Sequence, residues 1–279
     1  MDIFGTHLDN LKTYSTVVHE YNSFRLSGPE QIILRKFKDR WHKFRMLDIG
    51  VGRGRTSHVF SALVKEYHGI DYCAPMIDAC KGKGTIIEYE TVDFHVCDAR
   101  DLSQFYGATF DFILFSQNGI DSVDDDTRIK ILSEVRKVLN LEGYFFFSTH
   151  SLHSFFPIRK TISPFIATKP VRSAYRVWKG VRFLMRKRWL YRNADADSIA
   201  AQDWAVLITG DHNFKMKVYH IRPDYQVRQL REVGLSVESV YDCEGNLVDP
   251  LQAEAVQSPC LHFLCRLGAD AADNGGGGV

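Results

Sequence analysis

Short apolar runs alternate with longer amphipathic segments from residue 46 onward, and this alternation is the main signal in the chain. Runs rich in β-branched and aromatic residues predict strands, and the amphipathic segments between the first five of them predict helices. The predicted strands cover residues 44–50, 68–72, 92–98, 110–116, 143–150, 236–242 and 261–267. Strands that are apolar on both faces and separated by helices predict an α/β fold with a parallel sheet covered on both sides.

Helical periodicity is clearest in three segments. The first covers residues 27–41. In it, Ser27 is a candidate N-cap and Pro29 lies early in the helix, where its missing N–H costs nothing. Residues 125–140 predict a second helix, followed by a turn at Gly143, and residues 223–235 predict a third that ends at Gly234.

These patterns divide the chain into five parts. A helical lid (1–45) precedes a core (46–150), and a basic insert (151–222) separates the core from its C-terminal part (223–267). The last segment, 268–279, has no core-forming residues and predicts a disordered tail.

Composition and charge place the chain among ordinary globular proteins. It has 279 residues, a net charge of +1 and 45% hydrophobic residues. The six cysteines form no C-x-x-C pair, no His/Cys spacing indicates a metal site, and no secretory signal or membrane-spanning run is present. We therefore expect a reduced, cytoplasmic protein that has no metal and whose thiols act as buried apolar groups.

The stretch "MLDIGVGRGRTS" contains the most informative turn. Gly50, Gly52 and Gly54 follow the first predicted strand, and Asp48 precedes them. Glycine lets a ligand approach the backbone closely, but a carboxylate beside the turn disfavours a diphosphate and suits a ligand with a positive centre. This argues against NAD and ATP and for S-adenosylmethionine, with an unrelated glycine-rich turn as the alternative.

Polar residues also end the next three predicted strands. Asp71 ends the second strand, where it could accept hydrogen bonds from a ribose. Asp98 ends the third, where it could accept from an adenine amino group, and Ser116 and Gln117 follow the fourth. Singly, each is more often a turn or capping residue, but together they predict one binding crevice.

These segments resemble the motifs of class I S-adenosylmethionine-dependent methyltransferases. The similar segments are "LDIGVGRGRTS", "GIDYCAPMI", "CDARDL", "FDFILFSQNGIDSV" and "VRKVLNLEGYFFFSTHSL". The resemblance implies a Rossmann-like sheet of seven mostly parallel strands with helices on both faces, the last strand being antiparallel and inserted between the fifth and sixth. It also implies that Tyr72 and Ala99 contact the cofactor.

Methyl transfer needs alignment of the acceptor with the methyl group, and a base where the acceptor must lose a proton. His150, at the end of the fifth predicted strand, is the first candidate base, with His212 and Tyr14 next. Each could instead be a surface or structural residue.

Residues 159–192 hold 11 Lys or Arg and no Asp or Glu. Val171, Tyr175, Trp178, Val181, Met185 and Trp189 recur at helical spacing beside a stripe of arginines, so this segment predicts a basic amphipathic helix. The helix could simply cover the sheet with its arginines in solvent, bind an acidic acceptor, or lie on a membrane surface, and nucleic acid is the least favoured partner.

The sequence thus predicts a methyltransferase that acts on a small-molecule amine or hydroxyl, with S-adenosylmethionine as its cofactor. An RNA or protein methyltransferase and a non-catalytic cofactor-binding scaffold are the alternatives. Oligomeric state and the identity of the acceptor do not follow from the sequence.

Overall fold

The computed structural model describes residues 6–18, 25–81, 91–153, 185, 198–199, 201–208, 216–249, 251–252 and 258–268. The strands within these ranges are β1 (Arg45–Ile49), β2 (Glu66–Asp71), β3 (Val92–Val96), β4 (Phe110–Phe115), β5 (Leu139–Ser151), β6 (Trp204–Ile208), β7 (Lys217–Ile221), β8 (Leu235–Tyr241) and β9 (Cys260–Leu267). The α-helices are α1 (Thr6–Val17), α2 (Gly28–Lys36), α3 (Ser57–Phe60), α4 (Ala74–Lys81), α5 (Asp125–Val138) and α10 (Pro223–Glu232). The 3-10 helices are η2 (Trp41–Lys43), η3 (Ser103–Phe105) and η4 (Gly119–Ser122).

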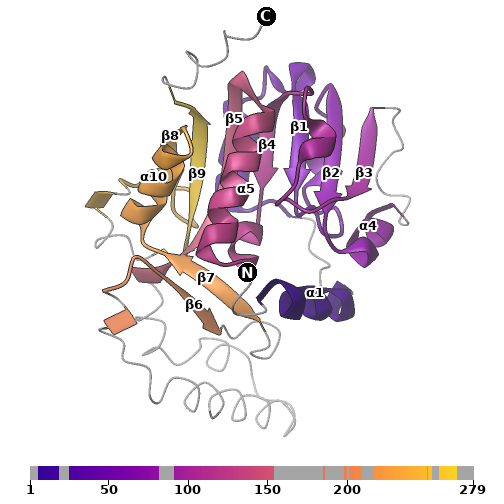
Figure 1. Cartoon of the computed structure of the whole chain (residues 1–279). Coiled ribbons are helices and arrows are strands. Elements are labelled where there is room, and N and C mark those ends of the chain that lie inside the picture. The colour runs from indigo at the N-terminus through magenta and orange to yellow at the C-terminus, as the bar shows by residue number, and fades with distance from the viewer. Residues whose placement is uncertain are drawn as a thin grey trace, which may run out of the picture.

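All of the described strands join one sheet in the order β3-β2-β1-β4-β5-β7-β6, with β9 paired to both β5 and β8 (Figure 1). Strands β1 to β5 pair with one another in parallel. Strand β9 is antiparallel to β5 and to β8, between which it lies. The predicted α/β fold and its antiparallel last strand are therefore confirmed.

The sheet has two strands more than the seven expected. Strand β7 continues the sheet beside the carboxyl end of β5, where His150 pairs with His220, and β6 runs antiparallel to β7. Both strands come from the segment 151–222, which was predicted only as a basic insert. The predicted basic helix of this insert lies outside the described residues, except for Met185.

The apolar strands separate two hydrophobic cores. Phe145 and Phe147 of β5 pack with α5 and α10 on one face, and Figure 1 shows these two helices on the same side of the sheet. Phe146 packs on the other face, in a core that includes Phe37 and Trp41. Alternate side chains of one strand thus enter opposite cores, which is why each strand is an unbroken apolar run.

Two local predictions have different outcomes. Ser27 caps α2 in a reciprocal capping box with Glu30, as expected from the sequence. Gly143, predicted as a turn, lies inside β5 instead. A Cβ atom at this position would lie 2.8 Å from the carbonyl oxygen of Phe110, so glycine allows the backbones to approach closely.

Helix α1 lies across the carboxyl ends of the strands (Figure 1). The buried side chain of Asn10 donates to the carbonyl oxygens of Ser122 and Lys217, at 3.3 and 3.0 Å. At the other end of the helix, the guanidinium of Arg53 donates to the carbonyl of Val18 at 3.2 Å. The predicted lid is thus attached to both halves of the sheet edge. No described helix is long and apolar enough to cross a membrane.

Candidate functional site

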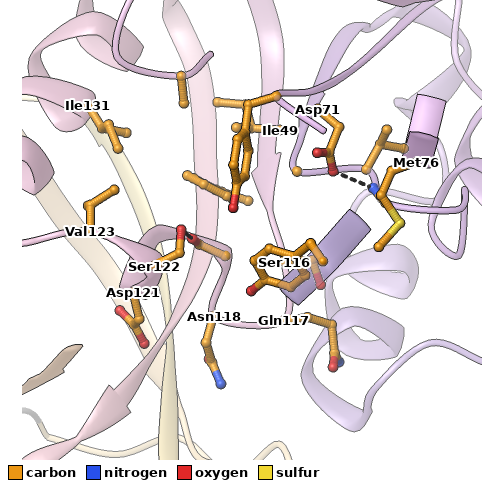
Figure 2. Close-up of a pocket in the computed structure, with 18 of the residues that line it drawn as sticks. Ile49, Asp71, Met76, Ser116, Gln117, Asn118, Asp121, Ser122, Val123 and Ile131 are labelled. Atoms are coloured by element: carbon orange, nitrogen blue, oxygen red, sulfur yellow. Dashed lines mark hydrogen bonds between the residues drawn. The ribbon is translucent and has the colours of Figure 1, made fainter. Parts of the chain in front are cut away.

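A cavity of about 620 Å³ opens at the carboxyl ends of the parallel strands, between the sheet edge and α1. In Figure 2, Asp71 and Met76 lie on one side of the cavity and Asp121, Val123 and Ile131 on the other. The segment that follows β4 lies between these two sides and includes Ser116, Gln117 and Asn118. This edge is where parallel α/β sheets bind ligands, because strand ends leave a crevice between their loops.

The backbone of the turn after β1 lines the cavity. Gly52 has a φ of +56°, which favours glycine, and a Cβ built on it would meet no atom within 4 Å. The space beside its α-carbon is therefore open cavity. A side chain at this position would occupy the volume that a ligand resting on the turn needs.

Asp71 holds this turn in place. One carboxylate oxygen accepts from the backbone N–H of Gly52 at 3.0 Å, and the other accepts from that of Cys73 at 2.8 Å. Burial raises the pKa of this 8% exposed carboxyl group, although both backbone hydrogen bonds oppose the shift. Each oxygen can still accept a further hydrogen bond. The group can thus bind a ligand hydroxyl while it orders the glycine turn.

Asp48 lies behind the turn, and neither Asp48 nor Gly54 lines the cavity. The carboxylate of Asp48 is 1% exposed and accepts from the hydroxyls of Thr56 at 2.5 Å and Tyr67 at 2.6 Å. The expectation that this carboxylate faces the ligand is therefore corrected. Its hydrogen bonds join β1 to β2 and to the end of the glycine turn, because Tyr67 reaches across from the neighbouring strand.

A buried ion pair supports the segment after β4. The guanidinium of Arg55 donates to both carboxylate oxygens of Glu30, at 2.6 and 2.7 Å, and to the hydroxyl of Ser116 at 2.6 Å. Ser116 also donates to Glu30. Burial would raise the pKa of Glu30, but the hydrogen bonds and charge of Arg55 outweigh it and lower that pKa. Ser116 therefore lines the cavity with its hydroxyl fixed by two charged neighbours.

Two residues after β4 have unusual backbone angles. Gln117 and Asn118 have φ values of 52° and 56°, which are uncommon for residues other than glycine. The backbone N–H of Asn118 donates to the hydroxyl of Ser148 at 2.8 Å, which holds the turn against β5. Such angles are found at binding sites, where the surrounding structure enforces them.

The remaining cofactor candidates also reach the cavity. The carboxylate of Asp98 lines it but is held by the guanidinium of Arg100, at 2.6 Å for the shortest pair of atoms. Ala99 is beside it. The rings of Tyr72 and Tyr14 meet edge to face with 6.2 Å between their centres, which joins α1 to the end of β2. Tyr14 therefore lines the cavity from α1.

The most elaborate hydrogen-bond network of the cavity surrounds His150. The Nδ1 atom of His150 and its backbone N–H both lie 2.7 Å from one carboxylate oxygen of Asp121. The Nε2 atom lies 3.2 Å from the side-chain nitrogen of Asn118. The imidazole is 24% exposed and lines the cavity, whereas the carboxylate of Asp121 is 1% exposed. A buried carboxylate thus fixes the orientation of a more accessible imidazole.

Asp121 stays ionised because the guanidinium of Arg128 contacts it. Its other oxygen accepts from the guanidinium of Arg128 at 2.5 Å and from the hydroxyl of Thr149 at 2.7 Å. Burial alone would raise the pKa of Asp121, but Arg128 and His150 outweigh it and lower that pKa. Asp121 is therefore a carboxylate at neutral pH and favours a proton on Nδ1 of His150. A neighbouring imidazole, His220, is kept neutral by burial, which lowers its pKa to about 4.

Most of the residues chosen from the sequence thus line one cavity. They are Tyr14, Gly50, Gly52, Asp71, Tyr72, Asp98, Ala99, Ser116, Gln117 and His150. His212 lies outside the described residues. Sequence reasoning missed Asn118, Asp121 and Arg128. The segment "NGIDSV" contains the first two of these, but nothing local in it indicates that Asp121 would bind a histidine 29 residues later.

Comparison with known proteins finds similarity to methyltransferases. Residues 46–143 match a family model described as a methyltransferase domain. An S-adenosylmethionine-dependent methyltransferase from Clostridium acetobutylicum has a similar structure, with a TM-score of 0.59 and 13% identity over 92% of this chain and 96% of that one. The CcbJ methyltransferase from Streptomyces caelestis gives a TM-score of 0.56 and 14% identity over 92% and 98% of the two chains.

The glycopeptide N-methyltransferase MtfA, solved with S-adenosylhomocysteine, gives a TM-score of 0.54 and 14% identity over 88% and 92% of the chains. No curated protein matches the chain. The chain contains a methyltransferase domain and has the fold of class I S-adenosylmethionine-dependent methyltransferases. The fold predicted from the sequence motifs is therefore confirmed, and residues 46–143 match a methyltransferase domain as the motifs predicted.

Proposed function

We propose that this methyltransferase acts on a small molecule that carries an amine or hydroxyl group, with His150 as the general base. The observation that carries this proposal is the contact between Asp121 and the Nδ1 atom of His150 at the wall of the cavity. A cavity of about 620 Å³ has a size typical of small-molecule sites.

The cofactor end of the cavity fits S-adenosylmethionine. Gly52 leaves its side-chain volume open, and Asp71 keeps hydrogen-bonding capacity for the hydroxyl groups of a ribose. The cofactor, when bound, supplies an electrophilic methyl group. These residues then have to hold the cofactor still, since alignment of the reactants can lower the barrier of such a displacement by about 7–11 kcal/mol.

His150 has the features that a base at this position requires. Asp121 accepts the proton of Nδ1, so Nε2 carries the lone pair. Asn118 contacts Nε2 at 3.2 Å, and an acceptor N–H or O–H that replaced this contact would place its proton at the base. The proton would move to Nε2 as the acceptor atom attacks the methyl group, and Asp121 would stabilise the resulting imidazolium.

The wall beside His150 supports an acceptor with an apolar body. Val123, Ile131, Met216 and Val218 line this side. One similar structure is named as a glycopeptide N-methyltransferase, which fits an amine of a natural product as the acceptor class. The basic segment 159–192 remains a candidate for contacts to an acidic group of the acceptor.

The test is the release of S-adenosylhomocysteine with a panel of small amines and hydroxyl compounds, followed by a pH profile of the best acceptor. His150→Gln should lower kcat by about a hundredfold, the usual contribution of a positioned base, with cofactor affinity unchanged within a few fold. It should also remove the acidic limb of the kcat profile. His153→Gln is the matched control, because His153 is half-buried and does not line the cavity.

Full kcat in His150→Gln, or an unchanged acidic limb, would show that His150 is structural. Turnover of RNA or protein alone, with none for small molecules, would overturn the acceptor class. Binding to RNA that weakens steeply with added salt would accompany the RNA alternative.

A further inference from the structure

Two cysteines meet where β8 and β9 diverge, close to the acceptor end of the cavity. The Sγ atoms of Cys243 and Cys260 lie 2.7 Å apart. This separation is longer than a disulfide bond, which is about 2.05 Å, but it is short enough that only a small movement would bring the sulfur atoms to bonding distance. Both residues are half-buried, so a small reagent can reach the pair.

The register of the two strands explains why the sulfur atoms meet. Tyr241, the last residue of β8, pairs with His262 of β9. Cys243 lies two residues after Tyr241 and Cys260 two residues before His262, so the two cysteines meet just beyond the end of the ladder.

Ser258 holds the two backbones in this arrangement. Its hydroxyl oxygen accepts from the backbone N–H of Cys243 at 3.0 Å and donates to the carbonyl oxygen of Cys260 at 2.7 Å. Ser258 is 6% exposed, so these bonds are shielded from water. The pair is therefore preorganised by a side chain outside it.

The two thiols have pKa values that are shifted in opposite directions, so they differ in reactivity. The contact between the two sulfur atoms lowers the pKa of Cys243 and raises that of Cys260, so Cys243 is the thiol that ionises first. The thiolate is the nucleophile in disulfide exchange. Burial has the opposite effect elsewhere and raises the pKa of Cys80 to about 12 and that of Cys97 to about 11.

We propose that Cys243 and Cys260 are a redox modification site, at which a low-molecular-weight disulfide oxidises the pair to an intramolecular disulfide. The Cys243 thiolate attacks one sulfur of the small disulfide, forms a mixed disulfide and releases one small thiol. Cys260 then loses its proton and attacks the sulfur of Cys243, which releases the second small thiol. Two protein thiols are oxidised and one small disulfide is reduced.

The sequence predicts that the cysteines act only as buried apolar groups, whereas the proposed site gives two of them a redox role. It is compatible with a reducing compartment, where disulfides form transiently and report redox conditions. Cys260 also pairs with His150 across β5 and β9, so the bond would form beside the proposed base.

The experiment exposes the full chain to oxidised glutathione, blocks the remaining thiols with an alkylating reagent and measures the intact mass. Wild type should lose two alkylation sites and regain them after reduction. Cleavage after glutamate separates the two cysteines, because Glu244 and Glu254 lie between them. The digest should contain a peptide that links Cys243 to Cys260.

Three variants make the result specific. Cys260→Ser should stop at the mixed disulfide and gain the mass of one glutathione on Cys243. Cys243→Ser should leave Cys260 unlinked. Cys97→Ser is the matched control, since Cys97 is also half-buried, and should form the Cys243–Cys260 link as wild type does. Six alkylated cysteines in oxidised wild type, or a link between other cysteines, would overturn the proposal.

Discussion

Asp48 carries a charge in a place where charge is costly, and replacing it tests the electrostatics of the glycine turn. The group is 1% exposed, and burial raises its pKa from 3.8 to about 6 despite the hydrogen bonds from Thr56 and Tyr67. A shift of about two units corresponds to about 3 kcal/mol of folding free energy. The folded pKa is raised, so this stability is present below about pH 4 and is lost as the pH rises through 6.

Asp48→Asn removes the titration but keeps an oxygen that can accept from both hydroxyls. We expect the free energy of unfolding of the variant, relative to wild type, to rise by about 3 kcal/mol between pH 4 and pH 7. The change in this free-energy difference from pH 4 to pH 7 is the critical quantity, because the buried amide N–H of the variant can alter its stability equally at both pH values.

Urea denaturation of the two proteins without cofactor, at several pH values, measures this difference. Asp39→Asn is the control, since Asp39 is exposed and should change stability little at any pH. A difference between Asp48→Asn and wild type that stays constant from pH 4 to pH 7 would refute the reasoning.

Three further predictions concern the ligands. Gly52→Val should abolish cofactor binding in calorimetry, whereas Gly107→Val, which has a similar φ of +85° and open space but lies away from the cavity, should bind normally. Asp71→Ala should weaken cofactor binding by about tenfold or more, since each hydrogen bond to a charged group contributes about 1.5–3 kcal/mol, and unchanged affinity in a folded variant would remove Asp71 from the site. Changing Arg176 and Arg182 to Gln should raise the KM of an acidic acceptor and leave cofactor affinity alone, and an unchanged KM would return these arginines to a solvent-facing role.

The sheet could be predicted because its strands are buried on both faces. A strand such as β4 contributes Phe112 to one core and Ile113 to the other, so its sequence is continuously apolar and ends abruptly at a polar residue. Strands β6 and β7 are as long as β1 and β3, but they escaped prediction because they lie in the insert, outside the alternation of strands and helices that identified the others. Their pairing depends on the distant end of β5.

The site was predictable where function depends on position along the chain, and less so where it depends on side-chain direction. Asp71 ends its strand and reaches the cavity. Asp48 is also near a strand end, but its side chain turns inward because Tyr67 on the adjacent strand donates to it. The Asp121–His150 contact joins two elements through tertiary structure, which a local motif does not reveal.

The attachment of α1 to both halves of the sheet edge has a kinetic consequence. Its side chains reach β7 through Asn10 and the end of β2 through Tyr14 and Tyr72, so these contacts hold the helix over the cavity in which we propose that the cofactor binds. We therefore expect departure of the spent cofactor to limit the steady-state rate, as lid opening does in many enzymes. If release of the spent cofactor is rate-limiting, the first turnover should be faster than the steady-state rate. Asn10→Ala removes one contact of the helix, so it should reduce the difference between these two rates.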